Sequence, residues 1–159
     1  MLPFQFMKLT IKFILVIMLF TLSALSQEHH IFQVPKFKHS ILKDIHCLAL
    51  NLHHEARGES VEGIKAVANV TLNRVKSGKF ADTVCKVIKQ PGQFSWVNTG
   101  LDKKNISIDP KIKQIAFDAL LSKDWVDNTN SALYFHNREV ETPFRRVVTA
   151  RIDNHIFYR

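Results

Sequence analysis

The stretch NLHHEARGES, residues Asn51–Ser60, separates two segments in which apolar residues recur every three to four positions. This spacing places apolar side chains on one face of a helix. Before the stretch, Ser40 is in position to cap a helix that we expect to run to about Arg57 and to stop at Gly58. The apolar face of this first helix consists of Ile41, Ile45, Leu48 and Leu52.

A second helix is predicted to begin immediately after the same stretch. Ser60 is a capping residue, Glu62 places a negative charge in the first turn, and Ser77-Gly78 ends the pattern. Residues 40–76 therefore form a helical hairpin with a tight corner. The inner stripe of the second helix consists of Ile64, Val67, Ala68, Thr71 and Val75.

Shorter elements follow the hairpin. Asp82 is expected to cap a short helix over residues 83–89, and Pro91-Gly92 predicts a turn. We expect QFSWV, residues 93–97, to be extended. Asp109-Pro110 is typical of a helix start, a cap followed by a proline in the first position. The inward residues of that helix are Ile112, Ile115, Ala119 and Leu120.

The last part of the chain changes to a period of two. The segments SALYFHN, FRRVVTARI and HIFYR, in residues 131–159, predict three short strands, with Asp153-Asn154 as a hairpin turn. No internal repeat interrupts the series. The fold class is therefore α+β, with helices first and a short antiparallel sheet at the C-terminus.

The N-terminal residues 1–26 have the features of a secretory signal peptide. Lys8 and Lys12 precede an apolar run, Phe13–Leu25, and Ala24-Leu25-Ser26 is a small-x-small cleavage motif. The run is shorter than the about 20 apolar residues that span a bilayer. The alternatives are an uncleaved anchor and a buried core helix.

Charge and export together restrict the partners. We expect residues 27–39 to be a flexible segment and residues 40–159 to form one domain. The formal net charge of +8 favours accumulation near anionic polymers, although ordinary solubility charge explains it as well. Nucleic acid is not expected as a partner, because the chain is predicted to be exported and its basic residues are spread rather than striped. Contact with a membrane is expected only through the signal peptide, and the oligomeric state cannot be read from the sequence.

The chain has two cysteines, Cys47 and Cys85. An even number of cysteines in an exported chain suggests a disulfide, and two free buried thiols are the alternative. Cys47 lies on the apolar face of its helix without a neighbouring cation that would favour a thiolate. A catalytic cysteine is therefore not expected.

Glu55 is the candidate for acid catalysis. A carboxyl group at a helix end over an apolar floor can have its pKa raised by desolvation, which would let it protonate the leaving oxygen of a glycosidic bond. The alternative is a solvated surface glutamate. Arg57 and Glu59 are either substrate contacts or a salt-bridged support of the corner.

The histidines offer a second chemistry, a zinc site. The HExxH pattern fails because Gly58 stands where the second histidine would be. A scattered zinc site of His54, His136 and His155 is the remaining possibility.

Seven motifs follow one another in the chain: HEARGES, EG, AVANVTLNRV, DTVC, QPGQFSW, ALYFHN and RIDNHIFYR. In this order they resemble the SleB-type cell wall hydrolase family, the spore-cortex-lytic enzymes. They cover residues 47–159, so the resemblance makes residues 40–159 a cell wall hydrolase catalytic domain. Asp153 and Ser131 stand where this family commonly has glycine, and we expect the hairpin to survive because aspartate tolerates the left-handed conformation. Two other functions compete with cleavage of the glycan by a carboxyl group. One is a zinc-dependent N-acetylmuramoyl-L-alanine amidase, which would use the histidines, and the other is a non-catalytic wall-binding module.

The resemblance implies a fold similar to lysozyme and the lytic transglycosylases. It implies cleavage of peptidoglycan glycan strands between N-acetylmuramic acid and N-acetylglucosamine, without a cofactor or metal, by an exported protein of the periplasm or exterior that associates with the cell wall. Glu55 would be the catalytic acid and base, and a Cys47–Cys85 bridge would pin its helix to the groove wall. The substrate-binding residues would be Glu59, Gln93, Phe94, Trp96, Tyr134 and His136, with core packing as the alternative for the aromatic ones.

Overall fold

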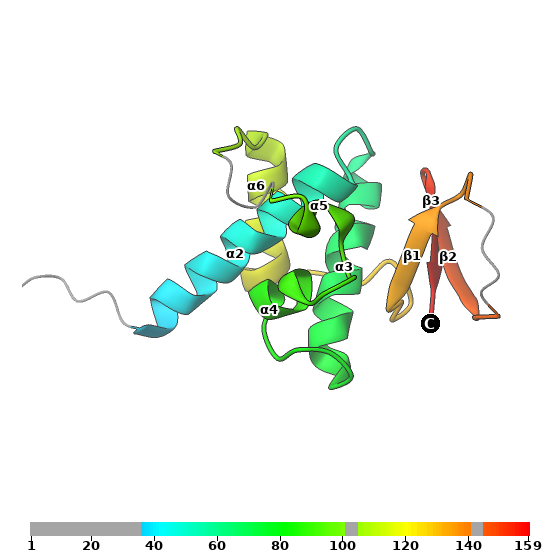
Figure 1. Cartoon of the computed structure of the whole chain (residues 1–159), viewed down its shortest axis with the longest axis horizontal. Coiled ribbons are helices and arrows are strands. Elements are labelled where there is room, and N and C mark those ends of the chain that lie inside the picture. Colours follow the sequence, from blue (N-terminus) through cyan, green and yellow to red (C-terminus); the bar gives the residue numbers. More distant parts are fainter. Residues whose placement is uncertain (1–35, 101–104, 141–144) are drawn as a thin grey trace, which may run out of the picture. The chain divides into compact units, whose positions relative to one another are not determined.

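The computed structural model describes residues 36–100, 105–140 and 145–159. Within these ranges five helices come first and three strands last, which confirms the α+β order expected from the sequence (Figure 1). None of the helices in these ranges is long and apolar enough to cross a membrane. The elements are α2 (Lys36–Glu55), α3 (Val61–Ser77), α4 (Val84–Lys89), α5 (Ser95–Asn98), α6 (Pro110–Leu121), β1 (Tyr134–Asn137), β2 (Val148–Ile152) and β3 (His155–Tyr158). The signal peptide expected over residues 1–26 lies outside the described residues.

Helix α2 begins at Lys36, four residues before the expected start at Ser40, so the cap expected at Ser40 is wrong. A serine can also lie inside a helix, because its backbone N–H can bond to the carbonyl four residues earlier. The helix crosses position 40 without a break. It ends at Glu55, and Gly58, with φ +101°, makes the corner.

Helix α3 has the ends that the sequence predicts. The Ser60 Oγ accepts a hydrogen bond from the backbone N–H of Gly63 (3.2 Å). Gly78 takes the left-handed conformation as the C-cap. Four of the five residues of the predicted inner stripe are fully buried, and Val75 is half-buried.

Two local predictions after α3 are wrong. Thr83 rather than Asp82 caps α4, because its side chain accepts from the N–H of Lys86 while the carboxylate of Asp82 binds the Lys86 ammonium. The QFSWV segment is not extended, since Ser95–Asn98 forms one helical turn, α5. In this turn both Phe94 and Trp96 point into the protein, where each is almost fully buried.

The helical core is centred on α2, which packs against α3, α4 and α6. Helix α6 starts as predicted, with the side chain of Asp109 accepting from the N–H of Lys111 (2.7 Å) and Pro110 in the first position. Cys47 and Cys85 form the disulfide, with 5.3 Å between their Cα atoms. This bond links the middle of α2 to α4. The sequence suggested the disulfide, and the structure confirms it.

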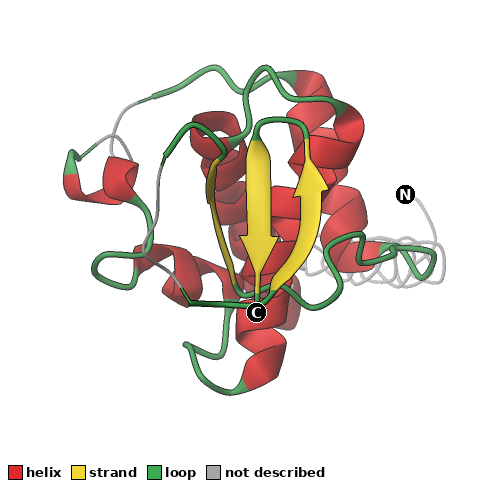
Figure 2. Cartoon of the chain, turned by 90° about the vertical axis from the view of Figure 1, so that its right-hand side faces the viewer, coloured by secondary structure: helices red, strands yellow, loops and turns green. Residues whose placement is uncertain are grey.

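The three strands form an antiparallel sheet in the order β1-β3-β2. Phe157 in the central strand packs with Ala66 and Val70 of α3, so one face of the sheet lies on that helix (Figure 2). The β2–β3 turn falls at Asp153-Asn154, as predicted, and Asp153 has φ +48°. All three predicted strands are present, each shorter than the pattern suggested.

Candidate active site

Glu55 is the last residue of α2, at the point where the chain turns toward α3. It is half-buried, next to the fully buried Ala56. Burial raises the pKa of the Glu55 carboxyl above its ordinary value, and the positive charge of Arg74 partly opposes this rise. A carboxyl group with a raised pKa can carry a proton closer to neutral pH, as general acid catalysis requires.

Arg74 is the residue of this site that the sequence analysis missed. It lies on α3 and is only 5% exposed. Its Nε donates to the backbone carbonyl of Leu133 (2.8 Å). The guanidinium carbon lies 5.2, 5.3 and 5.9 Å from the ring centres of Phe80, Phe94 and Tyr134. Three other segments of the chain thus surround one cation.

The burial of Arg74 is reflected in its electrostatics. Burial lowers the pKa of the guanidinium to about 10, against the raising effects of Tyr134 and Glu55. One of its terminal nitrogens, Nη1, is buried and has no hydrogen-bond partner in the part of the chain that the structure describes. The signal in the sequence was an arginine beside Val75 on the inner stripe of a helix, where a cation is rarely buried without pairing.

The QPGQFSW motif supports the site from within the core. The Nε1–H of Trp96 donates to Oδ1 of the fully buried Asn51 (3.1 Å), and the ring of His54 stacks on the indole with 4.5 Å between ring centres. Burial lowers the pKa of His54, and the charges of His53 and Arg57 add to this effect. Phe94 is also buried, against Arg74.

These contacts are those of core residues, which was the alternative interpretation for the aromatic side chains. Gln93, by contrast, is partly exposed. A sugar-binding role for Gln93, Phe94 and Trp96 stays a prediction.

Glu59 joins the corner to the β2–β3 turn. Its two carboxylate oxygens accept from the backbone N–H (3.3 Å) and the side-chain Nδ2 (3.1 Å) of Asn154. In the same place the N–H of Ser60 donates to Oδ2 of Asp153 (2.9 Å). Glu59 therefore supports the corner, as one of its two interpretations held, although through hydrogen bonds. Its role as a substrate contact stays a prediction.

Tyr134 and His136 lie on the same side of β1 because successive strand residues alternate. The guanidinium of Arg146 lies 3.5 Å from the centre of the Tyr134 ring, on which it stacks. The Nδ1 of His136 contacts the carbonyl oxygen of Asn137 (2.7 Å), which can only accept, so Nδ1 is the donor. In the neutral imidazole Nε2 then accepts from the hydroxyl of Tyr158.

Arg74 thus brings Glu55 and Tyr134 into one electrostatic cluster. His136 shares the strand face with Tyr134 and is held by Tyr158. Whether either side chain binds a sugar stays a prediction.

The histidines do not form a metal site in the described ranges. His54 stacks on Trp96, His136 binds Tyr158, and His155 is buried edge-on to the ring of Phe135. No three His, Cys, Asp or Glu side chains in these parts of the chain come together as metal ligands would. The scattered zinc set therefore has no geometric support.

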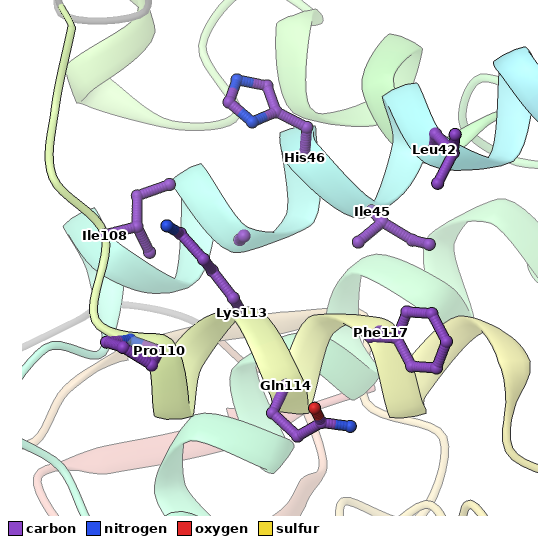
Figure 3. Close-up of a pocket in the computed structure, with 9 residues that line it drawn as sticks. Leu42, Ile45, His46, Ile108, Pro110, Lys113, Gln114 and Phe117 are labelled. Atoms are coloured by element: carbon purple, nitrogen blue, oxygen red, sulfur yellow. The ribbon is translucent and has the colours of Figure 1, made fainter.

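A separate groove of about 410 Å³ lies between α2 and α6, and none of the candidate site residues lines it (Figure 3). Its walls are mainly apolar, with Leu42, Ile45 and Ala49 on α2 and Phe117 on α6. The three α2 residues lie on earlier turns of that helix, before the end that carries Glu55. The groove is therefore not part of the candidate active site.

Comparison with proteins of known sequence gives consistent relatives. The chain is 38% identical over 119 residues to a spore cortex-lytic enzyme of Oceanobacillus iheyensis, covering 72% of this chain and 41% of that protein. It is 37% identical over 119 residues to the spore cortex-lytic enzyme of Bacillus cereus, covering 72% and 43%. The chain thus spans about two fifths of the length of the curated relatives it matches.

Solved structures show the same relationship. The catalytic domain of the Bacillus cereus SleB protein superposes with a TM-score of 0.65 at 34% identity, covering 74% of this chain and 91% of that one. The catalytic domain of the germination-specific lytic transglycosylase SleB from Bacillus anthracis gives 0.63 at 34% identity, covering 73% and 93%. The sequence model described as Cell Wall Hydrolase matches residues 58–158, a range that begins three residues after Glu55. The helical hairpin, the small sheet and this match over most of the chain agree, and the protein belongs to the cell wall hydrolase family.

Proposed function

We propose that this protein cleaves the glycan strand of peptidoglycan between N-acetylmuramic acid and N-acetylglucosamine, as a lytic transglycosylase. The observation that carries the proposal is the half-buried Glu55, whose pKa is raised by burial at the end of α2. The likeness to a structure named as a lytic transglycosylase supports the same reaction. Cell-wall association follows from the same family.

Glu55 has two successive roles in this reaction. First, its protonated carboxyl gives the proton to the glycosidic oxygen as the bond from that oxygen to C1 of muramic acid breaks. The resulting carboxylate then takes the proton from the C6 hydroxyl of the same sugar, and the C6 oxygen bonds to C1. The product is a 1,6-anhydro sugar, no water is added, and one carboxylate is sufficient.

Arg74 helps Glu55 to act as the base in the second step. Burial alone would hold the Glu55 carboxyl protonated, because desolvation disfavours the charged form. The positive charge of Arg74 favours the carboxylate that remains after the proton has left. The two opposing effects keep both protonation states of Glu55 accessible.

The amidase alternative is not favoured. It needs a zinc ion held by side chains, and the histidines suggested for that role point to different partners in the described residues. The relatives also support cleavage of the glycan strand.

Export is a further part of the proposal. It is supported by the signal-peptide pattern in residues 1–26 and by the disulfide, since disulfides persist in oxidising compartments. The N-terminal sequence of the protein recovered from outside the cytoplasm would start at Gln27. Retention of Met1 in that fraction would contradict cleavage.

The role of Glu55 is tested by clearing of a suspension of purified peptidoglycan. Glu55→Gln keeps the shape of the side chain but cannot carry the proton, so turnover should be lost while folding by circular dichroism is unchanged. Glu62→Gln is the matched control, because Glu62 is an exposed carboxylate on α3 that binds Lys65. Turnover by Glu55→Gln equal to that of Glu62→Gln would exclude Glu55 as the acid.

A further inference from the structure

A second hollow of about 300 Å³ lies where the C-terminal end of α3 meets the start of β1 and the end of β3. Figure 1 shows the last turn of α3 and the labelled C-terminus at the same, lower end of the picture. All the charged side chains that line the hollow are cations. The lining residues are Lys76, Lys79 and Arg159, together with Asn73, Ser77, Ser131 and Leu133.

Both lysines of this hollow are exposed. In the described ranges neither Lys76 nor Lys79 forms an ion pair within 4.0 Å. One carboxylate lies at the edge of the hollow, since Asp127 accepts hydrogen bonds from the lining residues Asn73 and Ser131. A terminal carboxylate at Arg159 would offset the positive charge of its own side chain, so the proposal below uses only Lys76 and Lys79.

The hollow adjoins the candidate active site. Leu133 lines the hollow, and its carbonyl oxygen accepts the hydrogen bond from Arg74. Lys79 precedes Phe80, whose ring lies 6.2 Å from that of Tyr134. The segments that enclose Arg74 therefore also form a wall of the cationic hollow.

We propose that this hollow binds the carboxylate groups of the peptide that branches from muramic acid, an inference that rests on the proposed function. The peptide is attached to the sugar that the site must hold, so a strand bound next to Tyr134 brings carboxylates to this edge. Two lysines and polar hydroxyl and amide groups suit such a ligand. Phosphate polymers of the wall carry the same sign of charge, but they are not attached at the cleaved sugar.

The test compares two substrates and two double variants. The substrates are glycan strands that carry the peptide and the same strands after enzymatic removal of the peptide. Lys76→Ala with Lys79→Ala removes two charges from the hollow. Lys111→Ala with Lys123→Ala removes two exposed charges elsewhere and is the matched control.

We expect the hollow variant to raise KM for peptide-bearing strands about five-fold, because an exposed ion pair contributes modestly and two are lost. Its kcat, and its KM on stripped strands, should equal those of the parent. The effect should shrink at high salt, since screening weakens exposed charge pairs. The control variant should behave as the parent on both substrates.

A binding titration of the free peptide against the catalytically inactive Glu55→Gln protein separates this inference from the proposed function. Peptide binding that is weakened about five-fold by loss of Lys76 and Lys79 supports the hollow even if glycan cleavage fails. The inference would be overturned if the hollow variant had the parental KM on peptide-bearing strands and bound the free peptide as tightly as the Glu55→Gln protein with both lysines. A glycerol-phosphate polymer that binds the hollow more tightly than the peptide would also overturn it.

Discussion

Replacement of Trp96 by phenylalanine tests whether this aromatic residue supports the site from the core. The indole donates to Oδ1 of Asn51, a side chain with no exposed surface, whose Nδ2 is buried without a hydrogen-bond partner among the described residues. Trp96→Phe removes the hydrogen bond to that amide oxygen. A buried polar group left unpaired costs about 1–3 kcal/mol, and the smaller ring leaves a void worth about 1 kcal/mol. We therefore expect unfolding to become easier by about 2–4 kcal/mol.

A second variant isolates the hydrogen bond from the change in volume. Asn51→Leu alone should also destabilise the protein, because it leaves the indole N–H of Trp96 buried without an acceptor. In the double variant both polar groups are gone, and replacing both partners by apolar groups can be nearly neutral. The double variant should therefore be more stable than the sum of the single changes predicts, by about 1–2 kcal/mol.

Urea unfolding followed by far-ultraviolet circular dichroism, without reductant, gives the four free energies of this cycle. KM and kcat of each folded variant give the second readout. Costs of the single changes that simply add would refute the hydrogen bond as the cause. A Trp96→Phe protein of parental stability with a strongly raised KM would show instead that Trp96 contacts the sugar.

Three other predictions concern the bridge, the corner and the catalytic acid. Reduction of the Cys47–Cys85 bond, which closes a loop with a sequence separation of 38, should lower the free energy of unfolding by about 4 kcal/mol; equal urea midpoints with and without reductant would contradict this. Gly63→Ala should lower Tm and reduce the free energy of unfolding by about 1–3 kcal/mol, because the new Cβ would clash with Oδ2 of Asp153. A raised Tm would show that the higher helix propensity of alanine outweighs the clash. Glu55 must start the reaction protonated, and burial raises its pKa. We therefore expect kcat/KM to fall as pH rises through that pKa, at a pH above the ordinary glutamate value of about 4.3. A fall in kcat/KM at or below that value would exclude Glu55 as the acid.

The helix ends that could be predicted from the sequence are those with local causes. Ser60 caps α3 through a bond to Gly63, three residues away, and Asp109 caps α6 through Lys111. The turn at Asp153 is likewise a property of a few neighbouring residues. Such signals are contained in the sequence window that is read.

The α5 turn and the Arg74 cluster could not be predicted because their causes are distant in sequence. Four alternating residues fit a strand as well as one helical turn, and the contact of Trp96 with Asn51 spans 45 positions. The position of Arg74 beside Val75 puts it on the inner stripe of its helix, but the sequence does not show which groups would surround a cation there. Its burial depends on Phe80, Phe94 and Tyr134, which three other segments supply.

In the proposed reaction Glu55 is the one carboxyl group that cleaves the glycan strand, and the strand's own C6 hydroxyl completes the reaction. Mass spectrometry of the sugars released from purified peptidoglycan measures this directly, with Glu55→Gln beside the parent. We expect 1,6-anhydro-muramic products, which are lighter by one water than the hydrolysed sugars, and we expect Glu55→Gln to release none. Reducing ends would show that the protein is a hydrolase. Release of free peptides by a fully active Glu55→Gln protein would exclude Glu55 as the catalytic acid.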